Sequence, residues 1–322
     1  MPPSDLPHAF APIAITSRSG VDESVHWGAL VVLASDGSVE LAVGDPEVVI
    51  YPRSSNKPMQ AVAMVRAGLE LAPELLALVC ASHDGTPQHL AGARRILAGA
   101  GLDEAALANT ADLPLDDDAA EAVLRAGGAR TPLQMNCSGK HSGMVATCVR
   151  NGWAHDPSYL SVDHPLQQRI TSTIAELAGE PIGHIGVDGC GAPAHMLSLT
   201  GLARAFRAIA VGDAGVAGAQ VYTAMTQHPE MVGGERRDVT AFMRHVPGLM
   251  AKDGAEGVMA VALPDGRAAA LKVADGSNRA RPVVLLAALE RLGVATDALA
   301  PLVTEPIRGH GAPVGEVRAV AP

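Results

Sequence analysis

Aromatic side chains are almost missing from this sequence of 322 residues. Phe, Trp and Tyr together make up 2% of the chain, whereas hydrophobic residues make up 48%. A sizeable core must therefore be built from Ala, Val, Leu and Ile packed at close range. The length allows either one large domain or two interleaved subdomains.

Positive charge and long apolar runs are also scarce. The formal net charge is −10, and no basic cluster with interleaved aromatic residues occurs, which argues against a nucleic-acid partner. No apolar run is long enough to span a bilayer. Residues 1–7 lack the basic start and apolar stretch of a signal peptide. We expect a cytoplasmic protein with no membrane partner.

The four cysteines form no C-x-x-C pair. Cys80 and Cys148 lie in apolar runs and are expected in the core, whereas Cys137 and Cys190 lie among glycines and polar residues. Because no secretory signal is recognised, we expect buried thiols, metal ligands or redox groups and no disulfide framework.

The pattern along the chain predicts an α+β protein. Residues 11–50 predict antiparallel strands with a hairpin turn at Asp36-Gly37, and residues 257–273 return to strands. Helical spacing dominates between them, with helices expected at 58–68, 144–150 and from His195 to about Arg207. We expect a single domain, 1–322, in which an antiparallel sheet flanked by helices (about 10–55 and 250–320) carries an inserted helical lobe (about 56–250).

A Ser-x-x-Lys pair, Ser54 and Lys57, lies where the strands give way to the first long helix. Positions three apart share one face of a helix, so the hydroxyl and the amine can meet. A lysine activates a serine when burial or nearby cations lower the pKa of the amine. The alternative is that Ser54 or Ser55 caps the helix and Lys57 faces solvent.

Other candidates lie in polar loops around Ser82, Cys137 and Cys190, and at Lys272, in a strand otherwise made of Ala, Leu and Val. A Ser-x-x-Lys after a hairpin, with a later lysine on a strand, is similar to the layout of serine β-lactamases and penicillin-binding proteins. Their Ser-Asp-Asn and Lys-Thr-Gly motifs are missing here. Lys272 could instead be an exposed residue of an amphipathic strand.

Five motifs occur together in order along nearly the whole chain: Arg53-Ser54-x-x-Lys57-Pro58-x-Gln60, Ala81-Ser82-His83, Asn136-Cys137-Ser138-Gly139-Lys140-His141, Val187-Asp188-Gly189-Cys190-Gly191 and Leu271-Lys272. The set resembles the asparaginase II family of the Rhizobium type, the class 3 L-asparaginases. The resemblance implies a fold similar to serine β-lactamases and glutaminases, and a homodimer. It also implies hydrolysis of L-asparagine to L-aspartate and ammonia.

The same resemblance implies roles for single residues. Two Ser–Lys pairs would match Ser54 with Lys57 and Ser82 with Lys272, and a metal site, usually zinc, would match Cys137, Lys140 and Cys190. Two thiolates suit Zn²⁺, whereas a lysine can be a ligand only as the neutral amine. The alternative is a pair of reduced thiols with no metal.

Arg53, His141 and Asp188 are candidate substrate-binding residues. Arg53 could instead hold the local chain, His141 could be a core histidine, and Asp188 could cap a turn. We expect Ser54 to attack the amide and Ser82 to relay the proton, although the two serines could exchange roles. Four rival functions remain: a glutaminase, another β-lactamase-like amidase or peptidase, a zinc amidohydrolase with water as nucleophile, and a non-catalytic binding module.

Overall fold

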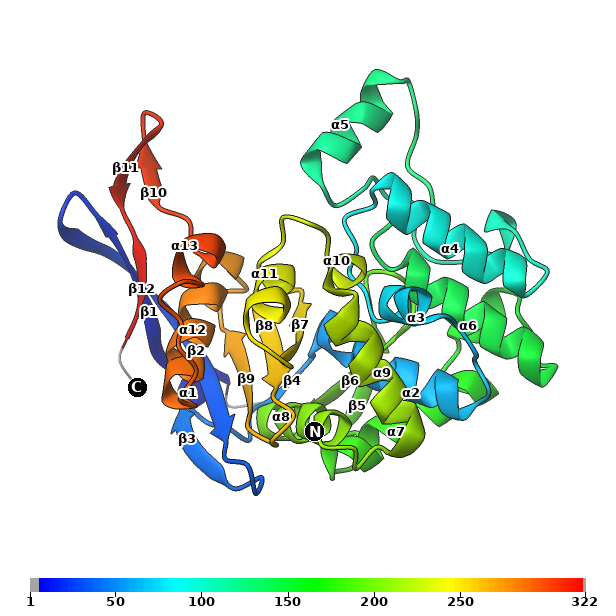
Figure 1. Ribbon diagram of the computed structural model, residues 1–322, viewed down its shortest axis with the longest axis horizontal. Coiled ribbons are helices and arrows are strands. Elements are labelled where there is room, and N and C mark those ends of the chain that lie inside the picture. Colours follow the sequence, from blue (N-terminus) through cyan, green and yellow to red (C-terminus); the bar gives the residue numbers. More distant parts are fainter. Residues whose placement is uncertain (1–5, 321–322) are drawn as a thin grey trace.

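The structure is a computed structural model that describes residues 6–320; residues 1–5, most of the N-terminal segment considered above, and 321–322 lie outside it. A large sheet and a group of helices lie side by side (Figure 1). No helix within residues 6–320 is long and apolar enough to cross a membrane.

The large sheet has seven strands in the order β12-β1-β2-β9-β8-β7, and β3 also pairs with β2. All neighbours are antiparallel. The strands come from the two ends of the chain: β1 (Ala11–Arg18), β2 (Val21–Leu33), β3 (Val39–Val43), β7 (Met250–Gly254), β8 (Val258–Ala262), β9 (Ala268–Val273) and β12 (Val317–Ala319). This arrangement confirms the prediction of an antiparallel sheet flanked by helices.

Small residues make the core of this sheet. Ala268, Ala269, Ala270 and Leu271 in β9 are each at most 1% exposed. Because neighbouring residues of a strand point to opposite faces, both faces of the sheet are covered here. Helices α8 (Leu199–Ala210) and α12 (Arg281–Arg291) both pack on β8 and β9. Alanine allows these helices to approach closely, which explains how a core forms with so few aromatic residues.

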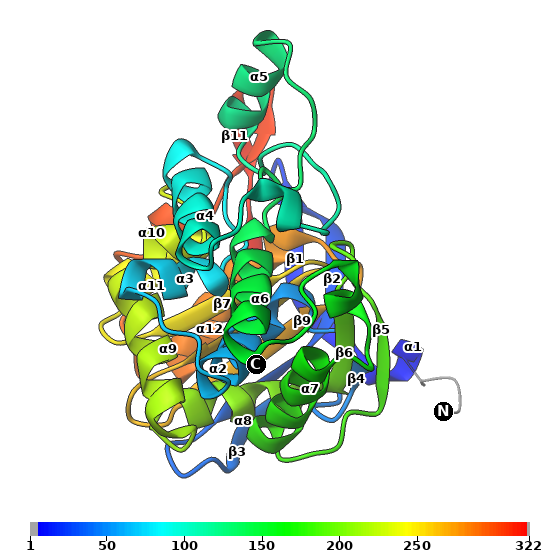
Figure 2. The same cartoon turned by 90° about the vertical axis from the view of Figure 1, so that its right-hand side faces the viewer.

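The middle of the chain is mostly helical. Helix α6 (Ser138–Asn151) contacts α2, α3, α4 and α7, and Figure 2 shows it in the middle of this group. The helices besides α6, α8 and α12 are α1 (Leu6–Ala9), α2 (Lys57–Arg66), α3 (Pro73–Val79), α4 (Pro87–Gly99), α5 (Asp117–Arg125), α7 (Pro165–Ala178), α9 (Gly215–Gln227), α10 (Pro229–Val232), α11 (Asp238–His245) and α13 (Ala300–Val303).

Two small sheets complete the fold. One has the order β4-β6-β5, from β4 (Val49–Ile50), β5 (His184–Val187) and β6 (Pro193–Ser198). The other is the hairpin of β10 (Ile307–Gly309) and β11 (Ala312–Gly315). Although α8 comes from the expected helical lobe, it packs on the large sheet, and the domain boundaries given above stay a prediction.

Two local predictions are wrong, and one strand has no predicted counterpart. Helix α6 begins at Ser138 and not at 144. Its first turn contains Gly139 because of close packing: a Cβ at this position would lie 2.4 Å from the Leu78 carbonyl oxygen. His195 lies in strand β6, and α8 begins only at Leu199, after Ser198 accepts the Gly201 N–H. Strand β7 was not expected at all.

Candidate active site

The Ser54 segment is a short 3₁₀ turn, Arg53–Asn56, that leads directly into α2. Arg53 has φ +53°, a left-handed conformation that is strained for any residue but glycine and is kept only where the surroundings hold it. Strand β7 provides that support. The Ser55 hydroxyl donates to the Lys252 carbonyl at 3.1 Å, and a Cβ at Gly254 would lie 2.3 Å from the Pro52 carbonyl.

The Ser82 hydroxyl lies between two buried lysines. Lys57 Nζ is 3.2 Å from Ser82 Oγ and Lys252 Nζ is 3.1 Å from it. Lys57 also donates to the Ala81 carbonyl, and the Ser82 backbone N–H donates to Val232 O at 3.0 Å. Lys57 is 1% exposed and Lys252 is fully buried. A hydroxyl between two amines can exchange protons with either of them.

Lys252 is the residue that sequence reasoning missed. Its amine also donates to the carbonyl and the carboxylate of Asp253. Burial lowers the pKa of Lys252, the Asp253 carboxylate opposes this, and the charge of Lys57 adds to it, so the pKa falls to about 8. At that pKa roughly a tenth of the amine is neutral at pH 7. The one sign of Lys252 in the sequence is a lysine within Met250–Gly254, a segment whose length is typical of a strand.

The two expected Ser–Lys pairs differ from those in the structure. Lys272 Nζ donates to the carbonyls of Glu256 and Val273 and does not form the expected pair with Ser82. The reason is its place on β9, which β8 separates from β7. Ser54 is half-buried, and within residues 6–320 no hydrogen bond joins its side chain to Lys57. The catalytic roles of Ser54 and Lys272 stay predictions.

The three predicted metal ligands come together. Cys137 precedes α6, Lys140 lies in its first turn, and Cys190 lies between β5 and β6. Lys140 Nζ is 3.1 Å from Cys190 Sγ, and the Cys137 thiol donates to the Asn136 side-chain oxygen at 3.1 Å. The neighbouring Cys137 side chain is the main influence that holds the pKa of Cys190 far below its usual range, helped by the charge of Lys140. Burial lowers the pKa of Lys140. Its charge interactions with the Cys190 and Cys137 side chains raise it by more, so the pKa lies above its usual value.

These donors fit zinc in number and kind only in part. No group of three or more His, Cys, Asp or Glu within residues 6–320 is placed to hold a metal, so any site must count Lys140. Two sulfurs and one amine, completed by a water, would make a four-coordinate site. Lys140 would have to give up its proton to bind the ion. The zinc site stays a prediction.

The predicted substrate-binding residues lie beside this cluster. Arg53 Nε and Nη2 are both 2.8 Å from Asp188 Oδ1, so these two residues bind each other. The same carboxylate oxygen accepts the Gly189 N–H at 2.8 Å. His141 is fully buried and 2.7 Å from the Tyr159 hydroxyl. Burial is the main cause that lowers the pKa of His141 to about 4, so the ring is neutral near pH 7.

A family comparison covers almost the whole chain. The model of a family described as L-asparaginase II matches residues 14–319. The chain belongs to the L-asparaginase II family. Membership of the L-asparaginase II family makes this protein a hydrolase that acts on an amide. The family resemblance deduced from the five motifs is thereby confirmed.

Comparison with solved structures finds distant likenesses. A β-lactamase of Mycobacterium bovis is 15% identical over 82% of this chain and 94% of its own, with a TM-score of 0.39. A Bacteroides dorei protein provisionally assigned to the β-lactamases is 16% identical over 82% and 92%, with a TM-score of 0.45. Mglu in its tris and glutamate form is 13% identical over 88% and 61%, with a TM-score of 0.39. The comparison with curated proteins finds no match.

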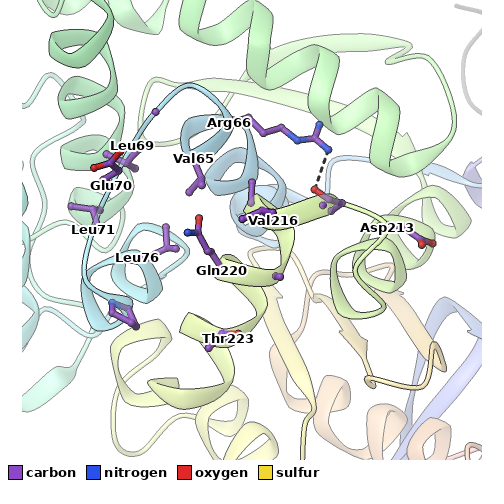
Figure 3. Close-up of a pocket in the computed structure, with 16 residues that line it drawn as sticks. Val65, Arg66, Leu69, Glu70, Leu71, Leu76, Asp213, Val216, Gln220 and Thr223 are labelled. Carbon is purple, nitrogen blue, oxygen red and sulfur yellow. Dashed lines mark hydrogen bonds between the residues drawn. The ribbon is translucent and has the colours of Figure 1, made fainter.

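A large pocket of this L-asparaginase II family member lies away from these residues. It has a volume of about 960 Å³ and lies between the α2–α3 connection and α9 (Figure 3). Arg66 at its edge donates to the Ala214 carbonyl at 3.2 Å and pairs with Glu176. None of the predicted site residues lines it, so its size does not make it the active site.

Proposed function

We propose that this protein is an L-asparaginase that hydrolyses L-asparagine to L-aspartate and ammonia with serine and lysine side chains. The observation that supports this most is the Ser82 hydroxyl held between the buried amines of Lys57 and Lys252. It lies in a chain whose family is defined by amide hydrolysis.

The two serines differ in access. Ser54 is half-buried, whereas Ser82 is 6% exposed. Because substrate must reach the nucleophile, Ser54 attacks the side-chain amide carbon, and its proton passes to the amine of Lys57 three positions further along. As the C–N bond breaks, Ser82 relays a proton from the lysine pair to the leaving ammonia. Water then hydrolyses the aspartyl ester and restores the Ser54 hydroxyl.

The Arg53–Asp188 pair suits the zwitterionic end of an amino acid. When substrate binds, Arg53 turns to the α-carboxylate and Asp188 to the α-ammonium, so the ion pair is exchanged for two others. Zinc held by Cys137, Lys140 and Cys190 would supply a fixed positive charge that helps orient the substrate. A cytoplasmic homodimer is part of the same proposal.

Ammonia release from L-asparagine and L-glutamine tests the proposal. Wild type should prefer L-asparagine, Ser54→Ala should abolish turnover, and Ser82→Ala should lower kcat about 10²–10⁴-fold. Ser161→Ala, on an exposed turn, is the control. Substantial activity in Ser54→Ala with none in Ser82→Ala would reverse the serine roles. A preference for L-glutamine would indicate a glutaminase, and no turnover of either amide would refute the proposal.

A zinc amidohydrolase with water as nucleophile is tested with the same variants. In that case chelation would abolish ammonia release while Ser54→Ala would retain it. The serine mechanism instead requires that Ser54→Ala releases no ammonia.

A further inference from the structure

A chain of ion pairs continues outward from Lys252. The Asp253 carboxylate binds the Lys252 amine with one oxygen. Its other oxygen lies 2.6 Å from Arg237 Nη2 and 3.8 Å from Arg281 Nη1. One carboxylate of strand β7 therefore meets three cations.

Each of the two arginines also binds a second carboxylate. Arg237 Nη1 is 3.2 Å from Asp84 Oδ1, and Arg281 Nη2 is 2.8 Å from Asp238 Oδ2. The side chains of Asp84, Asp253 and Arg281 are 6%, 7% and 6% exposed. Those of Arg237 and Asp238 are 23% and 13% exposed, so water screens the charges little at the centre of the network and more at its edge. We call these five residues the aspartate–arginine network.

The charges of the site do not balance if both lysines are protonated. Lys57, Lys252 and the two arginines would contribute four positive charges against three carboxylates. A net buried charge is unfavourable, and arginine does not lose its proton in proteins. One lysine must therefore be neutral for the charges to cancel. The Ser82 hydroxyl fits this state, because it can accept from an ammonium and donate to a neutral amine.

We propose that the aspartate–arginine network sets the pH at which the Lys57–Lys252 pair gives up its second proton, so that in the working form one acid and one base face Ser82 together. This inference rests on the proposed function, since it assigns the proton count of the same site. Asp253 and Arg237 are positioning residues in it, since both act through Lys252.

The groups around Lys252 agree with this count. Strand β8 faces it with apolar side chains only, and the 3₁₀ turn adds the neutral Ser55 hydroxyl. Cys80 at the end of α3 is an uncharged thiol, because burial raises its pKa to about 12. His83, which follows Ser82, adds no charge, because burial holds its pKa well below the usual value. Helix α11 adds Asp238, which binds Arg281. Lys57, Arg237 and Asp253 are the charges that act directly on Lys252.

Two substitutions of opposite sign test the inference through the pH dependence of kcat/KM for L-asparagine. Asp253→Asn removes a negative charge, so the pair loses its proton more readily and the profile moves to lower pH by about one unit. Arg237→Gln removes a positive charge, so the pair gains a second proton more readily and the profile moves to higher pH by about one unit. Structural damage would lower kcat without separating the two profiles in this way.

Arg236→Gln is the matched control, because this neighbouring arginine is exposed and pairs with Asp116 and Asp118 instead. Its profile should coincide with that of wild type. Thermal unfolding shows which variants fold; if either test variant does not fold, the direction of the other decides. If neither folds, Asp84→Asn, which acts through Arg237, should give a smaller shift to lower pH. Shifts that are absent or share one direction overturn the inference.

The two proposals fail differently. Wild type that releases no ammonia from L-asparagine refutes the proposed function. Wild type that turns over L-asparagine, with variant profiles that coincide, refutes only the proton count.

Discussion

Replacing Lys252 and Lys272 separately by methionine decides which strand lysine serves the reaction. Lys252 is fully buried and bound to Ser82 and Asp253, whereas Lys272 is partly exposed and bound to two backbone carbonyls. Methionine keeps most of the length and apolar body of the side chain. The substitution therefore removes the amine while disturbing the packing little.

The contacts give the expected magnitudes. Loss of a positioned acid or base lowers kcat about 10²–10⁴-fold, and this is the effect expected for Lys252→Met. Asp253 keeps its two arginines, so the free energy of unfolding should fall by only about 1–3 kcal/mol. Lys272→Met removes hydrogen bonds to carbonyls alone, which is worth about 1 kcal/mol. Its kcat should stay within about threefold of wild type.

Ammonia release at saturating L-asparagine measures kcat, and urea unfolding measures stability for the same preparations. A folded Lys252→Met enzyme with near-normal kcat would refute the assignment of Lys252. Loss of turnover in Lys272→Met would support the catalytic role of Lys272 implied by the family resemblance.

Three further outcomes are expected. Gly254→Ala should lower the free energy of unfolding by about 1–3 kcal/mol in urea, because its Cβ would meet the Pro52 carbonyl; Gly99→Ala, with open space around its Cβ, should not. Wild-type kcat/KM should rise between pH 6 and 8, because the pKa of Lys252 is lowered to about 8 and the lysine pair reaches its working form with one proton only towards that pH; a flat profile would contradict this. If the predicted zinc site is real, elemental analysis should find about one zinc per chain, retained in Cys148→Ala and lost in Cys190→Ala.

The sequence predicts the sheet well because local signals define its strands. The β-branched run of β1, the apolar run of β2, the alternation in β3 and the Asp36-Gly37 turn need no partner to be recognised. Strand β7 lacks such signals, since Lys252 and Asp253 are unfavourable in a buried strand unless distant arginines neutralise them. Those arginines come from α12 and from the loop before α11. A buried charge that is balanced only by tertiary contacts cannot be recognised from its own segment.

The metal-site residues could be grouped from the sequence only through the family motifs. Lys140 and Cys190 are 3.1 Å apart but 50 positions apart along the chain, so spacing alone does not connect them. Ser138 and Gly139 read as a loop because glycine and serine are poor helix formers. Helix α6 forms there because Gly139 has no Cβ, which leaves the space that Leu78 of α3 occupies.

The strand order β12-β1-β2-β9 has a consequence for how the chain is made. The edge of β2 that pairs with β9 has no partner strand until Ala268–Val273 have left the ribosome. That is roughly 230 residues later, or about 10–50 s at ordinary rates of synthesis. During this time Leu30–Leu33 present an apolar strand with an open edge, which is a template for pairing with other chains. A newly made chain should therefore depend on chaperones for solubility far more than the finished enzyme does.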